Sequence, residues 1–407
     1  MIHKMLENKK EFILCLAVFF SILSQAPFLR LVLNINTTIT SAPFWIISAL
    51  IGIFTLKRTY LNRETKIVIA LFLLFFFTIV LYEGITGNSY VFSYVTKPIY
   101  FSFFFFVLGS LFSRQVSNEL IKKIAFSYIA ATTIISLDIF IEYFLGTDIT
   151  AVTYIFRSKN SASSILLIAV IFCLYAFYPR NIWMNILKIL LISFFTFLIV
   201  IMRARAVLIS MLLIPIAYLL LPRGKRTIKI SILGAMLVGL VTIFASKTVF
   251  NFLINNILLK ATNSNNVNMD INYLTSNRFY EVLYSMYLFE LNPLFGKGYY
   301  YVDFFAVNSF VNYGFIAGLL LIIISVCPLL FCYRQFSKKN CFLYFMIALV
   351  CLINGLFEGL APFGPGNKFF ILWILFGLMC NMDEDILNRY SNSVSSYETK
   401  TFVELRI

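Results

Sequence analysis

The residues best suited to do chemistry in this chain are eleven lysines and arginines in or beside alternate loops between apolar segments. Positive charge in membrane proteins collects in cytoplasmic loops, and the other 22 of the 33 Lys and Arg residues follow that rule. The eleven do not, so they need another explanation, and we expect them to serve an anionic substrate on the outer side of a membrane. They are Arg30, Lys97, Arg157, Lys159, Arg203, Arg205, Lys247, Lys260, Arg278, Lys297 and Lys368.

Composition places these cations in an integral membrane protein. The chain is 60% hydrophobic and 13% charged, with a mean hydropathy of +0.88, whereas soluble domains average nearer ~25% charged residues. Apolar stretches of about 20 residues, the length that spans a bilayer core, recur along the chain. We therefore expect one all-α domain, a polytopic transmembrane helical bundle over residues 1–381. A polar cytoplasmic tail follows over residues 382–407 and is expected to be partly disordered.

The net charge of +15 does not indicate a nucleic-acid partner, because the predicted cytoplasmic loops account for most of it. The seven cysteines lie in or beside apolar segments without metal-ligand spacing, and the only histidine is His3. Histidine is the commonest metal ligand and a frequent acid–base group near neutral pH. We therefore expect chemistry without a metal or another cofactor.

Twelve transmembrane spans are predicted, and the charges between them set their direction. Basic residues follow every even-numbered span, as Lys57 and Arg58 follow the second and Arg334 follows the tenth. This pattern puts both termini in the cytoplasm. The spans are roughly 12–30, 42–56, 67–82, 94–112, 124–144, 161–178, 186–203, 205–221, 230–248, 308–332, 341–357 and 367–381.

The stretch from about residue 250 to 307 contains no span and faces outward in this topology. Within it, apolar residues recur at helical spacing between Asn277 and Glu290, which predicts an amphipathic helix resting on the membrane surface or against the bundle. The apolar positions are Phe279, Val282, Leu283, Met286 and Phe289, and the polar side carries Arg278, Glu281 and Ser285.

Three arginines are the strongest candidates for anion binding. Arg203 and Arg205 lie at the outer junction of the seventh and eighth spans, where a charge usually faces a polar cavity or snorkels to the interface. Arg278 opens the loop helix, whose positive end disfavours a cation but attracts an anion. A surface pair with Glu281 is the alternative for Arg278. Guanidinium groups suit phosphate because they offer paired, charge-assisted hydrogen bonds.

Weaker candidates complete the predicted site. Lys97 precedes the fourth span, and Arg157 and Asn160 precede the sixth; anchoring at the membrane interface is the alternative for each. The carboxylates Glu358 and Asp303 lie at outer ends of spans. Either could deprotonate an acceptor hydroxyl or form a structural pair with one of the arginines.

Four patches follow a pattern known from one family. Ile201–Leu208 places a single Arg, here Arg205, before small and apolar residues, and Asn277–Gly298 opens with Arg and ends in Pro-Leu-Phe-Gly-Lys-Gly. Val307–Gly318 enters the next span, and Lys97 stands where many members carry a basic residue. The order, the spacing and the predicted outward placement of these patches resemble those of the O-antigen ligase and O-antigen polymerase (Wzy) superfamily of bacterial inner-membrane proteins.

One departure from the family pattern separates its two branches. Ligases typically carry a His directly before the residue that corresponds to Asn308, but this chain has Val307 there and only His3 elsewhere. Polymerases vary at this position. The resemblance therefore implies a polymerase: a glycan on undecaprenyl pyrophosphate is transferred to the non-reducing sugar of another lipid-linked repeat unit, and undecaprenyl pyrophosphate leaves.

The resemblance also implies roles for individual residues. Arg205 and Arg278 would clamp the pyrophosphate and stabilise the charge that develops on it, and Glu358 or Asp303 would act as base. Tyr299 would stack on sugars, with an interfacial aromatic belt as the alternative. The implied partners are the lipid-linked glycan, membrane lipid and a polysaccharide chain-length regulator. The substrate-binding set is Lys97, Arg157, Asn160, Arg203, Asn308 and Tyr299.

Three other functions stay open at this point. A ligase would transfer polysaccharide to the lipid A core, and a lipid-linked oligosaccharide flippase would carry its substrate across the membrane. A flippase should line a central cavity with charges at mid-span positions, whereas this chain keeps its charges at span ends and in one outer loop. If the protein were a non-catalytic scaffold, the outer cations would have no function.

Overall fold

Apolar runs bounded by charged loops form helices along this chain, and a computed structural model shows where each begins and ends. The structure describes residues 2–26, 37–54, 61–87, 96–113, 118–149, 159–176, 182–220, 278–339, 342–364 and 369–380, with a few separate positions between 226 and 251. Within these residues the chain is all-helical, with twelve helices. The predicted ninth span is described only at scattered positions, and the predicted polar tail lies outside the described residues.

Eleven of the helices coincide with predicted spans, and one, α13, coincides with the predicted amphipathic loop helix. The helices are α1 (Ile2–Leu23), α3 (Thr37–Phe54), α4 (Arg63–Thr86), α5 (Lys97–Phe112), α6 (Asn118–Phe144), α7 (Lys159–Ala176), α8 (Ile182–Met202), α9 (Arg205–Leu220), α13 (Arg278–Leu291), α14 (Phe305–Lys339), α15 (Phe342–Gly355) and α16 (Phe370–Cys380).

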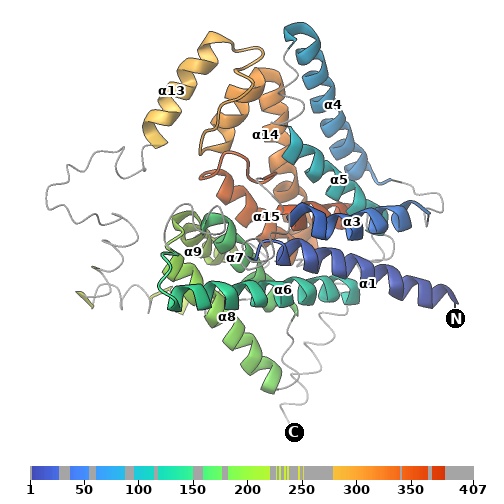
Figure 1. Cartoon of the computed structure of the whole chain (residues 1–407), viewed down its shortest axis with the longest axis vertical. Helices are drawn as coiled ribbons and strands as arrows, with labels where there is room; N and C mark the ends of the chain where they lie inside the picture. The colour runs from blue at the N-terminus through green and yellow to red at the C-terminus, as the bar shows by residue number, and fades with distance from the viewer. Residues whose placement is uncertain are drawn as a thin grey trace.

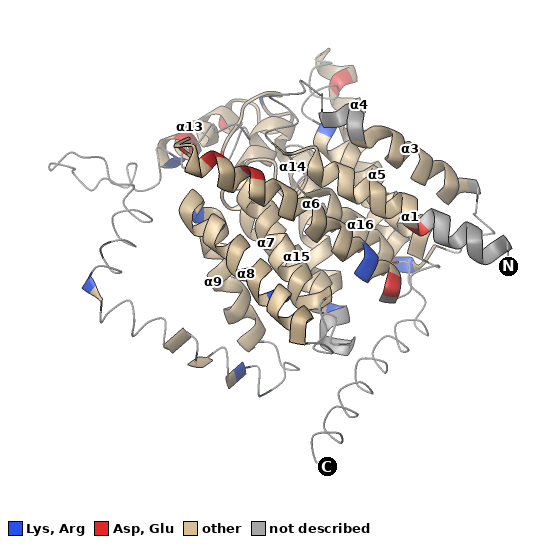
Figure 2. Cartoon of the chain, turned by 60° about the horizontal axis from the view of Figure 1, so that its bottom comes forward, with Lys and Arg blue, Asp and Glu red and all other residues tan. Residues whose placement is uncertain are grey.

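Five helices, α4, α6, α7, α8 and α14, are long and apolar enough to cross a membrane. The other apolar helices are shorter, and α16 has only 11 residues, about 17 Å at 1.5 Å per residue. In Figure 2 the helices are tan along most of their length, and the charged segments gather toward their ends. This arrangement agrees with a polytopic helical membrane protein, whose interior spans must be apolar.

The core forms where α16 packs against α5. Every residue of α16 is buried, and two glycines allow the helix backbones to meet. A Cβ atom on Gly109 would overlap the carbonyl oxygen of Ile374, and one on Gly377 would overlap that of Phe106. Close backbone approach through small residues is typical of helix pairs in membranes, where dispersion contacts stabilise association.

Hydrogen bonds between distant segments identify the two ends of the bundle. At one end, Asn62 before α4 donates to the carbonyl of Cys380 at the end of α16. At the other, Ser102 in the first part of α5 donates to Phe363, which precedes α16. This second end also carries the start of α14, beside which α13 lies, with α4 and α5 on the other side of α14 (Figure 1). The candidate site forms there.

Candidate functional site

A tight connection between α8 and α9 positions the first two arginines. Only Arg203 and Ala204 separate the helices, and Arg203 adopts a positive φ of 51°. The left-handed conformation costs a non-glycine residue about 1–2 kcal/mol, and such strain concentrates at functional sites. The Ala204 carbonyl accepts the N–H of Leu208 at 3.0 Å, which starts α9. Arg203 and Arg205 are thus held two residues apart, both half-buried.

Arg278, the first residue of α13, forms an ion pair with Asp303. Its Nη2 atom lies 2.9 Å and its Nε atom 3.1 Å from the same carboxylate oxygen, Oδ2. Both side chains are about one-third exposed, at 32% and 31%. Asp303 is 25 residues away in sequence, so the close partner is Asp303 and not Glu281, the surface partner considered from the sequence. For Asp303, the structural-pair reading is the one that the geometry supports.

The second guanidinium lies close to the first. Burial disfavours the charged form of Arg205 most, and the positive charge of Arg278 disfavours it further. Helices α9 and α13 thus bring two like charges into each other's range at one end of the bundle. Two cations in a partly desolvated position attract an anion more strongly than either alone, because Coulomb interactions strengthen as water is excluded. This pairing makes the place suitable for a doubly charged group such as a phosphate or pyrophosphate.

Acidic and phenolic groups border the two arginines. Desolvation raises the pKa of the Tyr301 hydroxyl, and the nearby carboxylates of Asp303 and Glu358 raise it further. Desolvation also raises the pKa of Glu281; Asp303 adds to that shift and Arg278 opposes it. Glu358 is buried, with 5% of its surface exposed. Tyr301 therefore stays a protonated hydroxyl that hydrogen-bonds Asp303, with the carboxylate of Glu358 nearby.

Two asparagines of α14 fix the segment that carries Tyr301 and Asp303. Asn312 accepts from the N–H of Tyr300 at 2.6 Å and donates to the carbonyl of Tyr300 at 2.7 Å, as a neighbouring strand would. Asn308 accepts from the N–H of Val302 at 3.0 Å and donates to the carbonyl of Gly359 at 2.7 Å. Asn308 thus connects the loop of Asp303 with the residue next to Glu358.

A break in α14 allows the loop to approach this closely. Gly314 has φ 74° and ψ −176° inside the helix, a conformation that is essentially restricted to glycine. Helical hydrogen bonding fails at the break, and the N–H groups of Lys297 and Gly298 donate to the carbonyls of Val311 and Asn312 instead. The N–H of Phe315 in turn donates to the Pro293 carbonyl at 2.8 Å. The Pro-Leu-Phe-Gly-Lys-Gly segment therefore replaces the missing partners of α14.

The start of α7 joins the same end of the bundle. Asn160 accepts a hydrogen bond from Ser164 through its backbone carbonyl at 2.7 Å, and Ser164 also donates to Asn354 at 3.2 Å. Asn354 lies near the end of α15, four residues before Glu358. Asn160 is thus near the site through its backbone and through Ser164.

Other predicted residues lie apart or cannot be placed. Lys97 is exposed at the start of α5, a helix that lies on the other side of α14 from α13 (Figure 1). Tyr299 is 65% exposed; stacking on sugars and the interfacial belt both fit this position. Arg157 lies outside the described residues.

The burial of its residues shows which side of α13 turns to the protein. Its buried residues are Ser285 and Leu288, so the polar side that carries Arg278 and Ser285 turns toward α14. Much of the predicted apolar side, including Phe279, Leu283 and Met286, is exposed. The predicted helix is confirmed. It buries Ser285 and Leu288, and Phe289 of the predicted apolar side contacts Phe310 of α14, while the exposed apolar residues are available to lipid.

Two site residues were missed from the sequence. Glu281 was considered only as a surface partner, and Asn312 was not considered as a loop-binding residue. The four-residue spacing of Asn308 and Asn312 inside an otherwise apolar helix was the available signal, because such pairs share one helix face and a buried amide needs partners.

The chemistry available here is anion binding beside a proton acceptor. Among the described residues, no group of three or more His, Cys, Asp or Glu could hold a metal ion. The positive charge at the site comes from guanidinium groups. No protein-family model matches this chain, and no curated protein matches it. The functional argument therefore depends on the site.

Proposed function

We propose that this chain is a membrane glycosyltransferase that polymerises undecaprenyl-pyrophosphate-linked oligosaccharide repeat units into O-antigen or a related surface polysaccharide. The observation that carries the proposal is the convergence of Arg205 and Arg278 beside Asp303, Tyr301 and Glu358. These residues come from α9, α13, the loop before α14 and the connection after α15. The resemblance of the surrounding patches to the O-antigen polymerases supplies the substrate class.

In the proposed reaction, the two arginines hold the donor's pyrophosphate. An acceptor hydroxyl oxygen forms a bond to the anomeric carbon, and the bond between that carbon and the pyrophosphate oxygen breaks. Undecaprenyl pyrophosphate leaves with the electron pair, and its developing charge is stabilised by preorganised cations. The hydroxyl proton passes to Glu358 or Asp303, the two carboxylates beside Tyr301. Tyr301 orients Asp303 by donating its hydroxyl hydrogen to that carboxylate.

The proposed topology places this site on the periplasmic face of a bacterial inner membrane, with both termini in the cytoplasm. The basic residues after even-numbered spans support this direction. A reporter enzyme that works only in the periplasm should be active when it is fused after Gly296. Activity at the same position of a reporter that works only in the cytoplasm would exclude an outward-facing site.

The test is glycan display in a strain that lacks the gene, with surface polysaccharide resolved by size on a gel. Loss of a polymerase should leave a product capped by a single repeat unit, and the restored gene should return the ladder of longer products. Loss of all surface-attached glycan, with long polymer kept on the lipid carrier, would instead show a ligase. Single units trapped on the inner face would show a flippase.

Restoring the strain with variants tests the arginines. Arg205→Ala and Arg278→Ala should each lower the polymerisation rate by about 10²–10³-fold, the cost of removing one charge-stabilising group. Arg278→Lys should recover only part of that loss, because an ammonium lacks the paired donors of a guanidinium. Arg334→Ala, at the far end of α14, is the matched control. Normal polymer from both alanine variants at normal protein levels would refute the clamp.

A further inference from the structure

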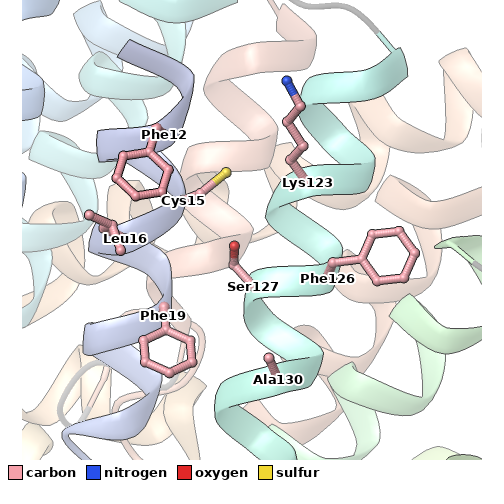
Figure 3. A pocket seen from close by; sticks show the side chains of 8 residues that line it. All are labelled: Phe12, Cys15, Leu16, Phe19, Lys123, Phe126, Ser127 and Ala130. Carbon is pink, nitrogen blue, oxygen red and sulfur yellow. The ribbon is translucent and has the colours of Figure 1, made fainter. Parts of the chain in front are cut away.

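A cavity of about 570 Å³ lies between α1 and α6, away from the proposed active site. Its volume is within the ~300–1,000 Å³ range of small-molecule sites. Figure 3 shows its side chains: α1 contributes those of one face, and α6 contributes Lys123 and the residues one and two turns further along. The lining residues are Phe12, Cys15, Leu16, Phe19, Lys123, Phe126, Ser127 and Ala130.

The cavity is apolar along most of its length and charged at one end. Phe12 to Phe19 cover about 10 Å of α1 at 1.5 Å per residue, and Ala130 leaves room on the facing side of α6. Cys15 and Ser127, whose side chains interact, are the polar groups within the cavity. An extended hydrocarbon chain matches this shape and polarity, because burying it removes apolar surface from water.

The charged end is Lys123. Its Nζ atom lies 2.6 Å from Glu11 Oε2, yet 47% of the lysine side chain remains exposed. An ammonium group has three N–H donors, so it can bind a second anion while it is paired with Glu11. Lys9 and Lys10 precede Glu11, and Lys122 precedes Lys123. Glu119, one turn before Lys123, also acts on the lysine, so the excess of positive charge is small: four lysines against Glu7, Glu11 and Glu119.

We propose that this cavity binds one acyl chain of an anionic phospholipid, with the lipid phosphate at Lys123. In the proposed topology, Lys123 follows an even-numbered span and faces the cytoplasmic leaflet, where anionic lipids are concentrated and where basic pockets between helices bind their head groups. The proposal depends on the placement of the helices in a membrane and not on glycosyltransfer. The cavity carries its charge at one end only, which matches a phospholipid with one head group. A second copy of the chain would instead have to cover the whole apolar length of the cavity.

The test uses the full-length protein in vesicles of phosphatidylcholine that contain a small fraction of phosphatidylglycerol with a photoreactive group on its acyl chain. After illumination, labelled peptides should map to the segments 12–19 and 123–130. Ala130→Trp, which fills the cavity, should remove most of this labelling. Ile134→Trp, on an exposed position of the same helix, is the matched control and should leave it unchanged.

The head-group contact needs its own variant. Lys123→Gln should lower labelling by photoreactive phosphatidylglycerol about fivefold, since one cation near a lipid surface contributes ~1 kcal/mol, and should leave labelling by photoreactive phosphatidylcholine unchanged. The Lys123→Gln variant also tests the proposal if the Ala130→Trp variant fails to fold. Equal labelling by the two lipids in the wild type, or labelling that Ala130→Trp does not reduce in folded protein, would overturn the proposal. Cross-linking of Cys15 to Cys15 of a second copy would also overturn it, by showing that a dimer contact fills the cavity.

Discussion

The loop before α14 and helix α13 border the same charged site, but the protein holds them in opposite ways. Backbone N–H groups of the loop at Lys297, Gly298, Tyr300 and Val302 donate to α14. Helix α13 buries only Ser285 and Leu288 against the rest of the protein. The loop is therefore fixed by hydrogen bonds to its backbone, whereas α13 is held by a few side chains.

This difference divides the proposed active site into a rigid side and an adaptable side. Asp303 and Tyr301 lie on the rigid side, and Arg278 lies on the adaptable side; the Arg278–Asp303 ion pair joins the two. Elements with few buried contacts open at a lower free energy than the core. In the proposed reaction, a bulky lipid-linked substrate enters by a small movement of α13 while the carboxylates stay in place.

The largest effect is expected where the loop meets the break in α14. Gly314→Ala should destabilise the protein by at least about 3 kcal/mol, because its backbone conformation suits only glycine and the new methyl group would overlap the Leu294 carbonyl. Gly84→Ala, in a helical position with open space around it, should cost nothing and is the control. The readout is thermal unfolding in detergent, followed with a dye that reacts with the buried cysteines. Equal unfolding temperatures for the two variants would show that the break is not needed.

A smaller loss should follow when the asparagine that binds the loop is removed. Asn312→Ala leaves the N–H and C=O of Tyr300 without their partners and should cost about 2 kcal/mol. Asn292→Ala is the matched control, since Asn292 donates one hydrogen bond to Gly296 at an exposed position. Its expected cost is below about 1 kcal/mol. The same unfolding assay measures both, and a larger loss from Asn292→Ala would contradict the rigid assignment of this loop.

The sequence predicts one of these two regions better than the other. The bounds of α13 follow from local signals: the apolar spacing after Arg278 and the stop at Asn292-Pro293. The side that α13 turns to the protein does not follow, because spacing shows which residues share a face and not what covers that face. Where lipid is the solvent, an apolar side can point outward.

The sequence also did not predict which side chains pair across the site. Asp303 and Glu358 were recognised as candidate bases from their outer positions, but the choice between base and ion-pair partner needed the tertiary fold. Arg278 is 25 residues from Asp303, and the loop between them is fixed by Asn308 and Asn312 of the next helix. Long-range contacts of this kind depend on packing that local propensity does not determine.

The ion pair that joins the two sides should have a modest and localised effect. Asp303→Asn should speed amide hydrogen exchange in α13 by up to about fivefold and leave α14 unchanged, because a partly exposed pair contributes no more than about 1 kcal/mol. Glu290→Gln removes an exposed acid at the other end of α13 and should have no effect. Faster exchange throughout α14 in Asp303→Asn would mean that the two sides open together.

The smallest effect should be a pH dependence in the docking of α13. The pKa of Glu281 is raised in the folded protein by desolvation and by Asp303, with Arg278 opposing; Tyr300 is a further neighbour of this group. Because the folded state holds this proton more tightly than the unfolded state, its contribution to stability is present below the ordinary pKa of a glutamate and is lost as pH rises through the raised value. Protection of α13 amides, corrected for the intrinsic exchange rate, should therefore fall as pH rises from below the ordinary pKa of a glutamate through the raised pKa of Glu281.

Glu281→Gln should abolish that slope and leave α13 slightly better protected at neutral pH than in the wild type. The glutamine keeps the size of the side chain but carries no charge to repel Asp303, so the variant isolates the charge. Protection in α14 provides the internal reference, since its hydrogen bonds to the loop involve no titrating group. A slope of the opposite sign, with protection rising toward neutral pH in the wild type and flat in Glu281→Gln, would show that attraction to Arg278 outweighs desolvation and that Glu281 helps to hold α13 in place.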